Sequence, residues 1–98
     1  MKNFRTYQIA VEFYRLATAV QLPVHLKNQL DRAASSISLN LAEGAGRFTT
    51  KDKKRFYRIA FASLRECQAI LDIANCQDGD ALESADKLGA HIFKLIRS

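Results

Sequence analysis

The stretch Leu26–Ala74 reads LKNQLDRAASSISLNLAEGAGRFTTKDKKRFYRIAFASLRECQAILDIA and decides the fold of this chain. It contains two long runs in which apolar residues recur at three- and four-residue spacing, the pattern of amphipathic helices. A short turn around Gly44–Gly46 separates the runs, and most of the basic residues follow that turn. The stretch therefore predicts a helical hairpin with one basic side.

The first run predicts a helix from about Val24 to Ala42 or Glu43, with Pro23 where the first turn of a helix tolerates it. Gly44 follows, and glycine is the usual residue in the left-handed conformation that ends many helices. We therefore expect the helix to end at Gly44. Its apolar face comprises Leu26, Leu30, Ala33, Ala34, Ile37 and Leu41.

A line of polar residues runs beside this apolar face, again at three- and four-residue steps. One interpretation is a hydrogen-bonded network across a helix or subunit seam, because buried polar groups need partners and satisfied networks fix one arrangement. The other is a recognition surface, and we favour the structural interpretation. A pair between Glu43 and Arg47 is expected only if the helix continues past Gly44. The line consists of Gln29, Arg32, Ser36, Asn40 and Glu43.

The second run begins at Thr49, which with Asp52 three residues later has the form of a capping box. The predicted helix continues to about Asn75. Tyr57 and Phe61 widen its apolar arc to roughly 200°, where a surface helix typically shows about 100° or somewhat more. One small core would not cover such an arc, so we expect Tyr57 and Phe61 to form part of an oligomer interface. The rest of the arc is Phe56, Ile59, Ala60, Ser63, Leu64, Cys67, Ile70, Leu71 and Ala74.

The opposite side of this helix carries a line of basic residues at helical spacing. Lys and Arg supply the sequence-independent part of nucleic-acid affinity, so the line fits a surface that tracks phosphates. The alternative is an ordinary solvated helix face. Cations near a helix N-terminus oppose the macrodipole, and this local cost favours a functional role. The line is Lys51, Lys54, Arg58 and Arg65, with Arg47, Lys53 and Arg55 near its beginning.

Two further helices flank the hairpin. Residues 4 to about 21 show the helical period, and Asp80 with Glu83 begins a last amphipathic segment whose apolar seam includes Leu88 and Ile92. Four helices with short connections are best satisfied by an antiparallel up-down-up-down bundle. We therefore predict an all-α fold, with residues 1–98 forming a single domain.

Charge divides unevenly along the sequence. Up to Leu71 there are twelve Lys/Arg and five Asp/Glu, and from Asp72 onward there are three and five, within a net charge of +5. A basic body attracts polyanions, most simply nucleic acid. No apolar run reaches the roughly 18–20 residues of a membrane span, and the N-terminal segment lacks the uninterrupted apolar core of a signal peptide. We expect a cytoplasmic protein that does not enter membranes.

The residues contain no recognisable reaction chemistry. His25 and His91 lie outside any metal-ligand spacing, and no nucleophile motif or complete phosphate loop occurs. Cys67 and Cys76 are too far apart on one helix for a disulfide, so both are expected to be buried thiols. We therefore predict no catalytic residue, no metal, no cofactor and no enzymatic activity.

The hairpin sequence resembles a family of bacterial four-helix-bundle proteins encoded in intervening sequences of 23S ribosomal RNA, also called S23-like. The match covers roughly residues 22–75 and fixes polar and glycine positions as well as apolar ones. Before and at the turn it comprises Gln29, Leu30, Arg32, Ala33, Ala34, Ser36, Ile37, Asn40, Ala42, Glu43, Gly44, Gly46 and Arg47. After the turn it comprises Arg55, Phe56, Ile59, Ala60, Ser63, Leu64 and Glu66.

The resemblance implies an antiparallel four-helix bundle that assembles into a ring-like homopentamer. It also implies a relation to basic accessory proteins of diversity-generating retroelements, which bind nucleic acid and a reverse transcriptase. No catalytic residue is established for the family. Two features depart from the family pattern. Ser38 stands where the family commonly has proline, which implies a straighter second helix. The join between the last two helices is short, which implies a change at one rim of the ring.

The sequence thus predicts a non-enzymatic oligomeric bundle that binds nucleic acid, particularly structured RNA such as ribosomal RNA, through the basic line. The alternative is an oligomeric scaffold or adaptor that docks a protein partner such as a polymerase, with the basic line as the docking surface.

Overall fold

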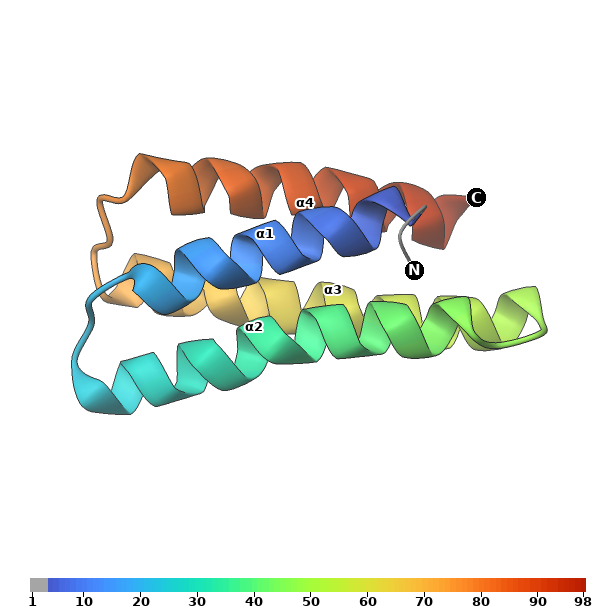
Figure 1. The fold of residues 1–98 in the computed structure, drawn as a ribbon, viewed down its shortest axis with the longest axis horizontal. Helices are drawn as coiled ribbons and strands as arrows, with labels where there is room; N and C mark the ends of the chain where they lie inside the picture. Colours follow the sequence, from blue (N-terminus) through green and yellow to red (C-terminus); the bar gives the residue numbers. More distant parts are fainter. Residues whose placement is uncertain (1–3) are drawn as a thin grey trace.

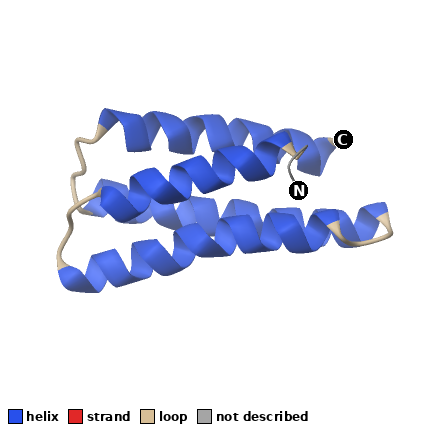
Figure 2. Ribbon diagram, viewed as in Figure 1, coloured by secondary structure: helices blue, strands red, loops and turns tan. Residues whose placement is uncertain are grey.

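The computed structural model describes residues 4–98, which form four helices and no strand (Figures 1 and 2). They are α1 (Arg5–Ala19), α2 (Val24–Ala45), α3 (Thr50–Ile73) and α4 (Gly79–Arg97). Each helix packs on two neighbours, α1 and α3 each lying between α2 and α4. The chain runs up, down, up and down, and the α2–α3 turn extends beyond the ends of α1 and α4 (Figure 1). The predicted all-α bundle is confirmed.

The core lies along the axis of the bundle, where one stripe from each helix meets the other three. Its largest fully buried side chains include Phe13 of α1, Ile37 of α2, Leu64 of α3 and Ile92 of α4. Apolar residues at three- and four-residue spacing bring such stripes to one side of a helix, and burying them drives the helices together.

Ile59, expected in the apolar arc of α3, is instead 41% exposed.

The ends of α3 follow local rules that the sequence shows only in part. At its start the Thr49 hydroxyl accepts a hydrogen bond from the Asp52 amide at 3.1 Å, which confirms the predicted cap. At its end Asn75 has a left-handed φ of 54°. The Cys76 amide donates to the Leu71 carbonyl and the Asn75 amide to the Asp72 carbonyl, the two bonds of a Schellman motif. The helix therefore ends at Ile73, two residues before the predicted end.

The start of α4 also differs from the prediction. The cap is Asp78, whose carboxylate accepts from the Ala81 amide at 3.1 Å, and the helix begins at Gly79. Asp80, predicted to start the helix, lies in its first turn. Both aspartates are suited to a helix N-terminus, because a carboxylate there complements the macrodipole. Spacing alone did not distinguish the cap from the first turn.

The expectation that α2 ends at Gly44 is wrong. The helix runs unbroken through Ser38 and Gly44 to Ala45, and Gly44 does not have a positive φ. A Cβ built on Gly44 would lie 2.7 Å from Cε1 of Tyr57. Gly44 is therefore required for the close approach of α3, whereas the turn does not need it.

No helix within residues 4–98 combines the length and the apolar character needed to cross a membrane.

Candidate nucleic-acid interface

Charge is concentrated at one end of the bundle, which measures 40 Å along its longest axis. We call this end, formed by residues 5–11, 41–59 and 91–98 around the α2–α3 turn, the basic end. It carries nine basic and two acidic residues, whereas the rest of the described chain carries five basic and eight acidic residues. The basic ones are Arg5, Arg47, Lys51, Lys53, Lys54, Arg55, Arg58, Lys94 and Arg97.

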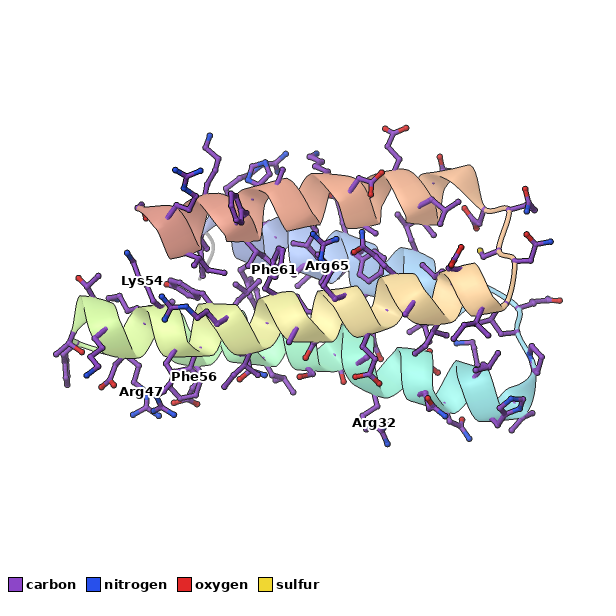
Figure 3. All side chains as sticks on the ribbon, turned by 180° about the vertical axis from the view of Figure 1, so that it is seen from behind. Arg32, Arg47, Lys54, Phe56, Phe61 and Arg65 are labelled. Carbon is purple, nitrogen blue, oxygen red and sulfur yellow. The ribbon has the colours of Figure 1, made fainter. Side chains whose placement is uncertain are left out.

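Two lysines predicted to bind nucleic acid have structural partners. Lys53 donates through Nζ to the carbonyl of Ala45 at 3.1 Å, at the C-terminal end of α2. Lys54 donates to the carbonyl of Ser98 at 2.8 Å, just after α4 (Figure 3). Helix C-terminal ends carry unsatisfied carbonyls and partial negative charge. Two adjacent lysines of α3 thus bind the C-terminal ends of its two antiparallel neighbours. These contacts offset the unfavourable interaction of the cations with the N-terminus of α3, which we interpreted as a sign of function.

Three other members of the basic line are exposed, and one of them, Arg65, also lies over the Phe61 ring. Lys51, Arg58 and Arg65 are exposed. Lys51 and Arg58 have no hydrogen-bond or ion-pair partner within the described residues, whereas Arg65 donates to the Gln68 side chain at 2.8 Å. A cation that is solvated in the free protein keeps its full capacity to neutralise a phosphate.

Arg47, in the α2–α3 turn, and Arg55, in α3, both lie beside Phe56. Their guanidinium carbons are 4.6 and 4.5 Å from the centroid of Phe56, so both cations contact this half-buried ring (Figure 3). Arg47 also donates to the Glu43 carboxylate at 2.8 Å, the ion pair that we expected only if α2 continued past Gly44. Arg47 therefore stabilises the turn, and its charge is already partly neutralised.

A second group of arginines and aromatic rings lies in the seam between α3 and α4. Phe61 and Phe93 have ring centroids 6.3 Å apart. The Arg65 guanidinium lies 4.7 Å from the centroid of the Phe61 ring, and Figure 3 shows the two side chains together. That of Arg97 lies 5.5 Å from the centroid of the Phe93 ring. Cations at this distance from a ring face are attracted to it.

The predicted interface role of Tyr57 requires correction. Tyr57 is only 8% exposed, and its ring centroid lies 6.2 Å from that of Phe4 within the same chain. Its neighbours Gly44 and Phe4 cover the part of the arc that we assigned to another subunit. Phe61 is half-buried against Phe93, so its role in an oligomer remains a prediction.

The polar line of α2 divides into two parts. Ser36 and Ser63 are joined by a 2.9 Å hydrogen bond between their hydroxyls, across the seam between α2 and α3. Asn40 donates to the Ser36 carbonyl and hydroxyl at 2.9 and 3.1 Å. These contacts agree with the predicted seam network. Gln29 and Arg32 are exposed and lie outside this network. Figure 3 shows Arg32 pointing away from the bundle.

Sequence reasoning missed the contribution of α4. Lys94 and Arg97 occupy its last turn and join the basic end, and Phe93 lies beside them. The signal was available, because an antiparallel bundle brings the end of the fourth helix beside the start of the third. We considered the basic residues of one helix only.

The titratable groups show one large perturbation. Burial, with a smaller contribution from Glu66, raises the pKa of the Cys67 thiol to about 12. Burial also raises the pKa of Tyr57. Both groups are in the core. Residues 4–98 contain no cluster of three or more His, Cys, Asp or Glu residues suited to holding a metal ion.

Comparison with known proteins gives one finding on identity. The model of the family described as 23S rRNA-intervening sequence protein matches residues 4–97, nearly the whole chain. No match is found among curated proteins. The family match extends over all four helices, including α1 and α4, where the sequence resemblance was in pattern only. The chain therefore belongs to the family of 23S rRNA-intervening sequence proteins.

Proposed function

We propose that this protein is a non-enzymatic subunit that binds structured RNA, such as ribosomal RNA, through the phosphates, using the basic end of the bundle. The observation that carries the proposal is the separation of charge along the molecule. Nine basic and two acidic residues meet at the basic end, and three positions of the α3 line, Lys51, Arg58 and Arg65, are exposed there or beside it.

The basic residues make different contacts within the protein, and these contacts refine the proposal. Lys53 and Lys54 bind helix ends, and Arg47 is paired with Glu43. The phosphate contacts are therefore assigned first to Lys51 and Arg58, with Arg55 and the α4 residues Lys94 and Arg97 beside them. Separated, solvated cations can each contact a different phosphate, and each such contact releases counterions. The site therefore favours a polyanion over one small anion.

Self-association is a second part of the proposal, supported by apolar side chains that the chain leaves uncovered. Leu39 of α2 is 68% exposed, Phe48 in the α2–α3 turn is 100% exposed and Ile59 of α3 is 41% exposed. Leu39 and Phe48 line one open hollow of about 530 Å³, and an exposed apolar surface of this kind fits contact with another protein. Sedimentation of the wild type and of a Leu39→Asp variant tests it, and a monomeric wild type would contradict it.

The test of nucleic-acid binding is a double charge reversal, Lys51→Glu with Arg58→Glu, measured by fluorescence anisotropy of a labelled ribosomal-RNA hairpin across a salt series. Each phosphate contact contributes about one unit to the slope of log affinity against log salt concentration. We expect the slope to fall by about two and the affinity at low salt to fall at least about tenfold.

The matched control is Arg15→Glu with Lys87→Glu, which makes the same change in net charge among exposed residues away from the basic end. We expect it to keep most of the affinity. Equal losses in the two double variants would show that only net charge matters and would contradict the assigned site. A wild-type protein that binds no RNA at low salt would contradict the proposed function and would favour the alternative, an oligomeric scaffold that docks a protein partner such as a polymerase.

A further inference from the structure

The seam between α3 and α4 contains an open groove of about 480 Å³, within the range of roughly 300–1,000 Å³ typical of small-ligand sites. Phe61 and Phe93 line it with their rings tilted 42° to each other, and Phe93 is 48% exposed. Gly89 and Ala90 of α4 also line it, so between Asp86 and Phe93 no long side chain of that helix fills the space. The groove is thus wide, aromatic and accessible.

Phe61 lies between members of the basic line along α3. Lys54, Arg58, Phe61 and Arg65 follow one another at steps of four, three and four residues, which places them on one side of α3. On α4, Phe93 and Arg97 are four residues apart and repeat the arrangement. Phe61 therefore has cations before and after it along α3, and Phe93 has one beyond it along α4; among the residues that line the groove, Arg65 is the cation.

This alternation is the arrangement that single-stranded nucleic acids require. Their phosphates follow cations, while their bases stack on aromatic rings and guanidinium planes. The Arg65 and Arg97 guanidinium groups lie 4.7 and 5.5 Å from the two ring centroids, so rings and guanidinium groups are adjacent in the open seam. A base-paired duplex cannot use such a groove, because its bases are stacked within the helix.

We propose that the α3–α4 groove binds unpaired nucleobases of the nucleic acid, with Phe61 and Phe93 as stacking platforms; the inference rests on the proposed nucleic-acid function and names the part of the RNA that is held. Loops and bulges of a structured RNA supply such bases beside the phosphates that the basic end contacts.

The chemistry of the groove distinguishes a base from an acidic peptide as its occupant. Asp86 lines the groove, and its carboxylate accepts a long hydrogen bond from the Gln68 amide at 3.4 Å. A carboxylate repels the acidic side chains of a peptide but accepts a hydrogen bond from the amino group of a base. The groove therefore favours a base that carries an exocyclic amino group, such as cytosine.

The experiment compares Phe93→Ala with wild type for two labelled probes of similar length, a 12-nucleotide oligocytidine and a 12-base-pair RNA duplex, by anisotropy at low salt. Loss of one stacking platform should weaken oligocytidine binding about tenfold and change duplex binding less than about twofold. Phe93→Trp should restore oligocytidine binding. Ala90→Leu, which fills the groove without altering charge or the core, should reproduce the selective loss.

The matched control is Tyr14→Ala, which removes a 37% exposed aromatic ring from α1, on the other side of the bundle. It should leave both affinities unchanged. Duplex binding without oligocytidine binding, or equal effects of Phe93→Ala on the two probes, would overturn the groove while leaving the proposed function intact. Failure of both probes to bind would overturn both.

Discussion

Helix α3 forms one seam with α2 and another with α4, and the two seams differ in the side chains that meet there. Toward α2 the contacts are small or polar: Gly44 lies under the Tyr57 ring, Ser36 bonds Ser63 and the Lys53 ammonium binds the end of α2. This is the most extensive helix pair in the bundle. Toward α4 the contacts are large rings, and the seam holds two hollows separated where Gln68 meets Asp86.

The difference shows how residue size decides whether a helix pair closes or leaves a groove. Glycine and serine allow two backbones to approach until the side chains of one fill the surface of the other. At the α3–α4 seam, Phe61 and Phe93 border the groove and each leaves part of its ring in solvent. A single helix can thus contribute a closed structural surface on one side and an open binding surface on the other.

The largest expected contrast is between the two thiols. Cys67 is fully buried in the core, whereas Cys76 is half-exposed and lines a hollow of about 360 Å³ in the α3–α4 seam. A thiol reagent at pH 8 should modify Cys76 at once and Cys67 only after unfolding, with rates at least roughly a thousandfold apart. Reaction of both thiols at similar rates would show that the core opens as readily as the seam.

The contribution of Cys67 to the free energy of unfolding should decrease at high pH. The folded pKa of about 12 lies above the ordinary value of 9.0. The neutral thiol therefore contributes its full stability below about pH 9, and this contribution is lost as the pH rises towards 12. Chemical denaturation of wild type and Cys67→Ala at several pH values should show the difference between them shrinking above pH 9.

The next largest effect should come from filling the closed seam. Gly44→Ala places a methyl group 2.7 Å from the Tyr57 ring and 3.1 Å from the Lys53 carbonyl oxygen. Overpacking typically costs about 1–3 kcal/mol, and the better helix propensity of alanine offsets up to about 1 kcal/mol. We expect a net loss of about 1–2 kcal/mol in the free energy of unfolding, measured by urea denaturation.

Gly89→Ala is the control for the open seam. Its Cβ would meet Leu64 at 3.4 Å, the far end of a flexible side chain. The helix-propensity gain should dominate there and stabilise the fold by up to about 1 kcal/mol. Equal effects of alanine at the two glycines would refute the difference in packing between the seams. In a Tyr57→Leu background, the loss from Gly44→Ala should become smaller.

The smallest effect should come from the hydroxyl pair of the closed seam. Ser63→Ala removes the partner of Ser36 and should cost about 1 kcal/mol or less. A double-mutant cycle with Ser36→Ala should give a coupling of about 0.5–1 kcal/mol in thermal unfolding. Ser35→Ala is the matched control, since the Ser35 hydroxyl bonds only the Arg32 carbonyl of its own helix. A coupling near zero would assign the closure of the seam to Gly44 and Lys53, without the hydroxyl pair.

The periodicity of the sequence was sufficient to predict the helices and their order, because apolar stripes and the Thr49 cap are local features. It did not predict helix ends that depend on neighbours. Gly44 was interpreted as a turn residue, whereas the position of Tyr57, thirteen residues later, requires it. The left-handed residue that sequence reasoning placed at Gly44 occurs instead at Asn75.

The candidate site could be predicted by residue type but not by role. The line of cations was visible in the spacing, and its exposed members remain the basis of the proposal. The assignment of Lys53 and Lys54 to helix ends required the positions of α2 and α4, which no single-helix projection contains. The same limitation concealed the pairing of Phe61 with Phe93, which joins residues of two helices.

The concentration of cations at one end has a consequence for how the protein approaches a partner. The bundle is 40 Å long, several times the Debye length of about 8 Å at physiological ionic strength. The acidic residues of the far end are therefore screened from a polyanion that is near the basic end. Attraction between charges acts before contact and turns the molecule, so the first encounters should occur end-on, with the α2–α3 turn leading.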